Sequence, residues 1–537
     1  MAVSYPVSRL LVLMAAAAAA IATTASPAAA PGERFEAFSW IHVPNADSRW
    51  RGPNVSTMVE IAPWTTVPDA ARRLKALPPG DRWVMLFIVT DDMANHPSDR
   101  CVRERIELQT TYVDAAPAPS RPSKARNARG AALAKQAAPV KVPVIRRVVT
   151  RQATEFRGPW LDNGVAATRS RMQAIMNGLK AAGAEVDGVI VDNETTLDAA
   201  HFLGRPGSLA AIEADPRWPA LAASLGLPRS LAGMSWGNSL YFAWTKVMSG
   251  RFDQALGQAV HAPIKAAFPN AVVSNYCSGN IAAQSAWPDI NGHVDVRSTP
   301  GFGTHDSHEF YGWLAPGRVA KVAGGSGTSG AFMALRLEVF KIRGMNASSS
   351  RPKHAWVASK SWAGETWGRV PLKDSAMWDE LVMQLALNGI EDFLHFSPYL
   401  PADPWAPGEA FLAQITKDHD SLEAVLAELN SVMGDASGRP LGIAQPAWGE
   451  RVIASGRVVG DEVVWRFSFD AGIDSVTVAF ADGESVRIDR EPGRSGAWFR
   501  HPAARTLRME QGGRPMISEQ HADSVPPQGS SGAGPAA

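Results

Sequence analysis

The stretch Asp187-Gly188-Val189-Ile190-Val191-Asp192-Asn193-Glu194 decides how this chain of 537 residues is interpreted. Glycine and three apolar residues follow Asp187, and acidic and amide side chains then appear abruptly. A parallel strand that is buried on both faces has such a continuous apolar run. In an α/β barrel the residues at the carboxyl ends of the strands carry the chemistry, so Asp192 and Glu194 are candidate catalytic acids. The alternative is that an acid at this position only caps the next helix.

Strands and helices alternate on both sides of this stretch. We expect further strands at 35–43, 83–89, 271–277, 354–360 and 393–396. We expect helices at 66–77, 169–182, 240–268, 332–342, 375–387 and 421–432. The alternation predicts an α/β fold, a TIM (β/α)8 barrel that spans residues 31–435. No Gly-x-Gly-x-x-Gly follows the first strand, which argues against a dinucleotide-binding fold.

Three other segments depart from this pattern. Residues 115–145 are basic and rich in Ala and Pro, and we expect them to form a surface insertion in the barrel. Apolar residues alternate with polar ones after 440, and Asp482-Gly483 is a turn signal, so 440–510 should form a small antiparallel, β-sandwich-like domain. The segment 511–537 is rich in Gly, Pro and Ser and is expected to be disordered.

The first thirty residues resemble a targeting segment. Arg9 precedes the apolar run Leu10–Met14 and a series of alanines, and Ser26–Ala30 offers small residues for cleavage. This pattern predicts a signal peptide and a secreted or periplasmic protein, with retention of the segment as an anchor as the alternative. No later stretch is apolar for the length of a membrane span. A net charge of +1 does not favour binding to nucleic acid.

Cysteine and tryptophan content leave alternatives open. Cys101 and Cys277 either form one disulfide in an exported protein or remain two separately buried thiols. The chain has 18 Trp but only 6 Tyr. The indole rings either stack on sugar faces or fill a large core.

The residues Val191-Asp192-Asn193-Glu194 resemble the end of the fourth strand in retaining TIM-barrel glycoside hydrolases of clan A, in particular the family 42 enzymes. The segment from Trp378 to Phe396 resembles their seventh helix and eighth strand. The resemblance implies that Glu194 is the acid/base and that Asn193 contacts the 2-hydroxyl of the sugar.

In that family the nucleophile lies at the end of the seventh strand. Here Lys360 occupies about that position, and Glu365 is the acid that follows it. The resemblance therefore implies Glu365 as the second catalytic carboxylate, with Asp306 and Glu309 as substitutes if their loop folds over the site. Two carboxylates are sought because one must protonate the leaving oxygen, while the other attacks the anomeric carbon or activates water.

A second resemblance uses the same strand. Asp187-Gly-x-x-x-Asp192-x-Glu194 is similar to the fourth-strand signature of chitinase-like family 18 enzymes. It implies that Glu194 is the acid and that Asp192 supports a substrate N-acetyl group. A third interpretation is a non-catalytic, carbohydrate-binding protein on a barrel scaffold.

His305-Asp306-Ser307-His308-Glu309 is interpreted as a polar loop at the cleft, with metal binding through its two imidazoles as the alternative. The sequence predicts no metal and no cofactor, an oligo- or polysaccharide substrate, and no particular oligomeric state. Substrate-binding candidates at or beyond the strand ends are Trp40, His42, Asp91, Asn193, Asn275, Tyr276, Tyr311, Lys360, Trp362, His395 and Tyr399.

Overall fold

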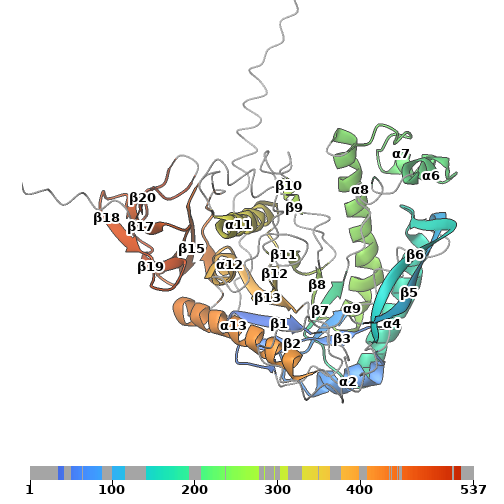
Figure 1. Cartoon of the computed structure of the whole chain (residues 1–537), viewed down its shortest axis with the longest axis horizontal. Helices are drawn as coiled ribbons and strands as arrows, with labels where there is room; N and C mark the ends of the chain where they lie inside the picture. The colour runs from blue at the N-terminus through green and yellow to red at the C-terminus, as the bar shows by residue number, and fades with distance from the viewer. Residues whose placement is uncertain are drawn as a thin grey trace, which may run out of the picture.

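Two parallel sheets form the centre of the computed structural model (Figure 1). The structure describes residues 34–41, 50–62, 65–86, 100–114, 141–192, 203, 207–235, 238–276, 283–284, 295–296, 303–311, 329–348, 350–362, 376–397, 408–434, 436, 438–443, 446, 450–510 and 513–521. The first sheet has the order β11-β12-β13-β1-β2, and the second has the order β3-β4-β7-β8. Their strands are β1 (Glu36–Trp40), β2 (Val55–Thr57), β3 (Val59–Ile61), β4 (Trp83–Leu86), β7 (Gly188–Asp192), β8 (Val272–Tyr276), β11 (Asp306–Glu309), β12 (Lys353–Ala358) and β13 (Ile390–Phe396).

The two sheets adjoin at both of their edges. Only Met58 separates β2 from β3 along the chain. At the other edge, the amide of Thr304 donates a hydrogen bond to the carbonyl oxygen of Val273 on β8 at 2.8 Å, just before β11 begins. The inner faces also meet, because Phe38 of the first sheet stacks on Trp83 of the second with ring centroids 4.1 Å apart. Every pairing within these two sheets is parallel, which confirms the predicted α/β class.

Helices cover the outer faces of both sheets (Figure 1). One apolar core joins the first sheet to three of them, and a second core joins the second sheet to the others. The first group is α11 (Gly330–Ser348), α12 (Ala376–Leu387) and α13 (Glu409–Met433). The second group is α2 (Val67–Lys75), α4 (Asp162–Ala181), α8 (Ser239–Leu256) and α9 (Ala262–Ala267), with the single π turn η4 (Gly257–His261) joining the last two. Two short helices follow β7, namely α6 (Ser208–Ala214) and α7 (Trp218–Ser224).

Helix α2 shows how local sequence sets these boundaries. The Thr66 hydroxyl accepts a hydrogen bond from the amide of Asp69 at 3.3 Å, and Pro68 lies in the first turn, where its missing N–H costs nothing. Ala70, Ala71 and Leu74 recur at helical spacing and are buried. The predicted helix 66–77 is therefore confirmed. Among the described helices, none is long and apolar enough to cross a membrane.

An antiparallel hairpin that the sequence did not predict lies between β4 and α4. Its strands β5 (Arg100–Asp114) and β6 (Lys141–Arg157) pair along most of their length. The predicted basic insertion at 115–145 thus overlaps the start of β6, and its residues 115–140 lie outside the described residues. The short strands β9 (Ala283–Gln284) and β10 (Asp295–Val296) form a second antiparallel pair.

The C-terminal part consists of two antiparallel sheets, as predicted for residues 440–510. Their orders are β14-β15-β16-β19 and β18-β17-β20, and their side chains share one apolar core. Gly483 turns between β17 and β18 with φ +92°, a conformation that favours glycine. The strands are β14 (Arg439–Pro440), β15 (Val452–Val459), β16 (Glu462–Phe469), β17 (Ile473–Ala479), β18 (Ser485–Asp489), β19 (Gly496–Pro502) and β20 (Ile517–His521). The predicted disordered tail from 511 is corrected, since β20 pairs with β17 up to His521.

This β domain packs on helices α11 and α12 (Figure 1). Arg466 on β16 donates two hydrogen bonds to Glu380 on α12, from Nε at 3.0 Å and from Nη2 at 2.5 Å. Arg343 on α11 reaches the carbonyl oxygen of Ala454 at 2.6 Å. Because these polar groups are buried and paired across the boundary, the two parts form one continuous packed structure.

Candidate functional site

Strand β7 ends with Asp192 at the carboxyl edge of the second sheet. Strand β7 lies between β4 and β8, and Asp192 is in register with Tyr276 at the ends of β7 and β8. Asn193 and Glu194, which follow directly, lie outside the described residues. Because all strands of both sheets run parallel and the two sheets adjoin, the carboxyl end of β7 lies at the same edge as the carboxyl ends of β1, β3, β11 and β12.

Glu60 is a buried carboxylate near this edge. Its neighbours Val59 and Ile61 on β3 pack into the core beneath the helices, so alternation turns Glu60 to the opposite, inner face. There Trp40, the last residue of β1, donates its indole N–H to Glu60 Oε2 at 2.8 Å. A buried indole N–H needs an acceptor, and this hydrogen bond joins the first sheet to the second.

Glu309 is a second buried carboxylate, at the end of β11. His308 and Phe310 face α11, since the ring of Phe310 lies 5.7 Å from that of His308 and 5.3 Å from the ammonium of Lys341. Alternation turns Glu309 the other way, in register with Trp356 of β12. The prediction that 305–309 form a polar loop is therefore wrong, because four of these residues form a buried strand.

Five aromatic rings contact one another in a group that we call the aromatic cluster, and one of them, Trp40, bonds to Glu60. They are Trp40, Tyr311, Trp356, Trp362 and Phe396. The ring centroid of Trp40 lies 6.3 Å from Trp356 and 5.5 Å from Phe396, and Tyr311 stacks on Phe396 at 5.7 Å. Of the predicted substrate-binding residues, the structure thus brings together Trp40, Tyr311 and Trp362. Aromatic rings beside carboxylates are typical of sites that bind and cleave sugars, and in the described residues the rings of Trp40, Tyr311, Trp356 and Trp362 are buried.

Lys360 and His395 point away from this inner face. The ammonium of Lys360 lies 2.7 Å from Asp379 on α12, and its predicted contact with substrate stays a prediction. His395 is fully buried between β13 and α13. Within the described residues, the contacts of these two side chains are with groups outside the aromatic cluster.

His395 belongs to a buried chain of hydroxyls and imidazoles. Its Nδ1 lies 2.7 Å from Ser39 Oγ, and its Nε2 lies 3.2 Å from Ser359 Oγ. His419 on α13 donates from Nδ1 to the carbonyl oxygen of Trp50 at 2.9 Å, so neutral His419 accepts from Ser39 at Nε2, also at 2.9 Å. Burial lowers the pKa of His419 to about 4 and that of His395 well below its usual value.

The opposite, amino-terminal edge of the strands holds other titratable groups. The rings of His305 and His354 stack at 4.6 Å, and His354 Nε2 lies 3.6 Å from Asp392. Burial lowers the pKa of both imidazoles to about 3, so both are neutral. His305 stacks on His354, whereas His308 faces α11. The two imidazoles therefore cannot bind one metal ion together, which rules out that alternative. Within the described ranges, no three acidic, His or Cys side chains form a set that could hold a metal ion.

Several predicted residues cannot be placed. His42, Asp91, Glu365 and Tyr399 lie outside the described residues, as does Cys277. Asp192, Asn275 and Tyr276 are placed only as backbone positions at the ends of β7 and β8. Sequence reasoning missed Glu60 and Trp356, although the pattern Val59-Glu60-Ile61, an acid between two β-branched residues, is the signal that could have found the former.

Comparisons with known proteins give structural neighbours but no sequence relatives. No protein-family model and no curated protein matches the chain. Among solved structures, Amy13B of Eubacterium rectale matches with 9% identity and a TM-score of 0.37, over 89% of this chain and 95% of that one. A glycoside hydrolase of family 5 from Bacteroides vulgatus matches with 10% identity and a TM-score of 0.30, over 91% and 90%. A family 36 α-galactosidase from Geobacillus stearothermophilus matches with 10% identity and a TM-score of 0.35, over 89% and 55%.

Another match, the agarase AgWH50C, has a TM-score of 0.26 and 10% identity over 51% of this chain, which spans 40% of the agarase. TM-scores below 0.5 do not establish a shared fold, so the function proposed below depends on the residues of this chain. Glycoside hydrolases of several families, families 5 and 36 among them, are thus among the solved structures that this chain matches.

Proposed function

We propose that this protein is an exported glycoside hydrolase with a (β/α)8 barrel, and that Glu194 is its general acid/base. The observation that carries the proposal is the position of β7. This strand ends at Asp192, two residues before Glu194, at the same carboxyl edge where Glu60, Glu309 and the aromatic cluster lie. The N-terminal pattern of residues 1–30 supports export.

The barrel is supported by the way the two sheets adjoin. If β2 and β3 count as one strand interrupted at Met58, eight parallel strands follow one another around the interior. The Thr304 to Val273 hydrogen bond then joins the fifth strand, β8, to the sixth, β11. Phe38 against Trp83 and Trp40 against Glu60 fill the enclosed interior from opposite sheets.

Hydrolysis needs a second carboxylate besides Glu194. Glu309 faces the interior at the end of the sixth strand, and Glu365 follows Trp362 of the aromatic cluster by three residues. We favour Glu309, because its placement is supported by the alternation of β11. Asp306 is excluded from this role, since it lies on the outer face, 3.7 Å from Arg351. A separation of about 5 Å between the two carboxyl groups would give retention, and roughly 6.5–9.5 Å would give inversion.

Glu60 has a different role in this proposal. Its carboxylate accepts the indole N–H of Trp40 and so fixes the orientation of that ring. An oriented indole presents a flat apolar face to the C–H groups of a sugar ring. Glu60 is therefore a positioning residue, and the aromatic cluster forms the floor of a carbohydrate site.

The test compares two kinds of leaving group. Wild type, Glu194→Gln, Glu309→Gln and Glu365→Gln are assayed on a panel of nitrophenyl glycosides and oligosaccharides, with the product anomer read by NMR. Loss of an acid should lower kcat by about 100-fold or more on oligosaccharides. The loss should be smaller on nitrophenyl glycosides, because nitrophenolate leaves without protonation. Binding of a polysaccharide without hydrolysis by the wild type would instead indicate the non-catalytic alternative.

A further inference from the structure

The segment that leaves β12, Ser359–Trp362, is held at every residue, and we call it the β12 exit. The amide of Ser359 donates to the carbonyl oxygen of Phe396 at 3.0 Å, and the amide of Ser361 donates to Asp418 Oδ1 at 3.2 Å. The amide of Trp362 donates back to the carbonyl oxygen of Ser359 at 3.0 Å. The side chain of Trp362 joins the aromatic cluster. Strand β13 and helix α13 thus hold the backbone of the β12 exit.

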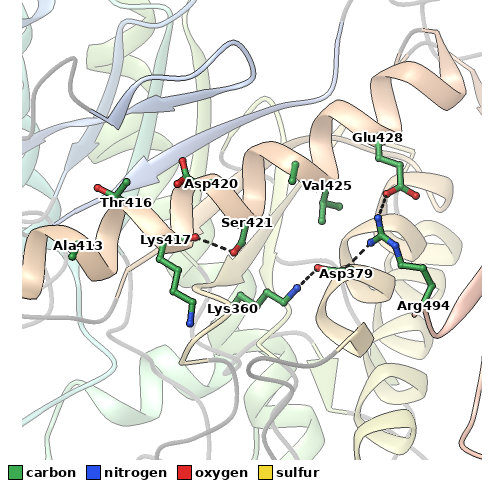
Figure 2. A pocket seen from close by; sticks show the side chains of 11 residues that line it. Lys360, Asp379, Ala413, Thr416, Lys417, Asp420, Ser421, Val425, Glu428 and Arg494 are labelled. Atoms are coloured by element: carbon green, nitrogen blue, oxygen red, sulfur yellow. Dashed lines mark hydrogen bonds and ion pairs between the residues drawn. The ribbon is translucent and has the colours of Figure 1, made fainter. Parts of the chain in front are cut away.

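The side chain of Lys360 holds the same segment at a further point. Its side chain enters a groove of about 670 Å³ between α12, α13 and the turn that joins β18 to β19 (Figure 2). There its ammonium lies 2.7 Å from Asp379 Oδ1 and 5.7 Å from the ring centroid of Trp378. The groove therefore brings the β12 exit next to the β domain.

A chain of charged groups crosses this groove. Figure 2 shows Lys360 and Arg494 on opposite sides of Asp379. Arg494, from the turn between β18 and β19, lies with Nη1 3.5 Å from Asp379 Oδ2 and donates from Nη2 to Glu428 Oε2 at 2.8 Å. Glu428 also accepts the indole N–H of Trp498 at 2.9 Å. Arg494 is thus tied to the β domain by its backbone, to α13 by Glu428 and to the β12 exit through Asp379.

The solvent exposure of these charged groups limits how much their ion pairs contribute to stability. Arg494 is 38% exposed, Lys360 22% and Glu428 21%, so each ion pair is partly solvated. Ion pairs in this range contribute about 0–1 kcal/mol to stability each. Their geometric effect is larger, because one guanidinium sets the position of two carboxylates on different helices.

We propose that Arg494 is a positioning residue through which the β domain fixes the β12 exit. Arg494 thereby also fixes the position of Trp362 in the aromatic cluster. The catalytic part of this inference rests on the function proposed above, whereas the positioning part does not. Arg494→Gln removes the charge but keeps much of the side-chain volume. Arg494→Lys keeps a charge that reaches one carboxylate at a time, so it should restore part of the effect. The matched control is Arg500→Gln, which breaks the exposed pair with Glu462 in the same domain.

The experiment has two readouts on the full chain. Amide hydrogen exchange of the peptide that covers 359–362 should become about fivefold faster or more in Arg494→Gln and in Asp379→Asn, and should stay unchanged in Arg500→Gln. On the best substrate of the panel, kcat should fall about tenfold in Arg494→Gln with little change in KM, since a displaced Trp362 side chain misplaces a bound substrate. The thermal midpoints of the Arg494 and Arg500 variants should agree closely.

Exchange of 359–362 at the wild-type rate in Arg494→Gln would overturn the positioning role. Faster exchange with an unchanged kcat would overturn its link to catalysis. A wild type that hydrolyses no member of the panel would count against the proposed function alone, because the exchange measurement would still decide the positioning role.

Discussion

Asp379 and Glu380 are neighbours on α12, and each pairs with an arginine of the β domain, but in different surroundings. Glu380 and Arg466 are 1% and 0% exposed, and Ser468 adds a further hydrogen bond to the carboxylate at 2.6 Å. Asp379 is 11% exposed and Arg494 38%. The comparison shows that one helix turn carries two kinds of contact. The buried pair stabilises the fold, whereas the solvated pair adds little stability and mainly sets the positions of its side chains.

The buried pair is costly to leave half-made. Burial raises the pKa of the Glu380 carboxyl, while the charge of Arg466 and its hydrogen bonds act in the opposite direction. Once one partner is removed, the other remains as an uncompensated charge in a dry interface. The solvated pair lacks this penalty, because water replaces the missing partner.

The largest expected effect follows from breaking the buried pair. Arg466→Met should lower the free energy of unfolding by about 3–5 kcal/mol, because Glu380 is then buried without its counter-charge. Urea unfolding followed by far-UV circular dichroism measures the change. A loss below that of the solvated pair would contradict the comparison. The double variant Arg466→Met with Glu380→Leu should recover much of the loss.

Lowering the pH should also destabilise the protein, because buried neutral histidines must then take up protons. The pKa of His419 is lowered to about 4 from an unfolded value near 6.5, so the unfolded state binds more protons in that window. Stability is therefore fully present above about pH 6.5 and falls as the pH drops toward 4, by roughly 1.4 kcal/mol per pH unit for this group. His395, His305, His308 and His354, whose pKa values burial also lowers, add to the slope, while Asp392, whose pKa burial raises to about 6, opposes it.

The measurement is the free energy of unfolding between pH 7 and pH 5 for the wild type and His419→Gln. The variant keeps hydrogen-bonding groups but cannot titrate, so its slope should be shallower. Equal slopes would show that His419 does not titrate as its surroundings require.

A smaller effect is expected from crowding the buried pair. A Cβ atom on Gly496 would lie 2.4 Å from Glu380 Oε2 and 2.7 Å from Arg466 Nε. Gly496→Ala should therefore cost about 1–3 kcal/mol of unfolding free energy through overpacking. Gly442→Ala is the control, since nothing lies within 4 Å of its added methyl group. Equal stability of the two variants would mean that the interface can yield.

The smallest effect on stability belongs to the solvated pair. Arg494→Gln should change the free energy of unfolding by about 1 kcal/mol or less, and the change should shrink further at high salt. Chemical unfolding at low and high ionic strength checks this expectation. A loss as large as that of Arg466→Met would remove the distinction between the two contacts.

The sequence predicted the regular elements better than the directions of their side chains. Helix α2 and strand β7 carry their signals locally, in the Thr66 cap and in the apolar run that ends at Asp192. His395 lies in the run Phe393-Leu394-His395-Phe396, where apolar residues on both faces conceal which face is inner. Only its pairing with Ser39 and the packing of His419 determine that it faces α13.

The missed parts of the site depend on long-range packing. Strands β2 and β3 have three residues each, so the single alternation of Val59-Glu60-Ile61 is the whole local signal for Glu60, and it is too brief to establish a strand without its neighbours in the sheet. Strand β11 reads as a polar loop because its burial depends on α11, which follows it in the chain and covers His308. Lys360 lies at a strand end as expected, but Asp379 on the next helix determines where its ammonium points.

The most direct test of the central claim is the rate of Glu194→Gln on two substrates, an oligosaccharide and the nitrophenyl glycoside of the same sugar. We predict a fall in kcat of about 100-fold or more on the oligosaccharide, a clearly smaller fall on the aryl glycoside, and an unchanged thermal midpoint. Wild-type rates on both substrates would contradict the account, because the carboxylate that follows β7 would then have no part in the reaction.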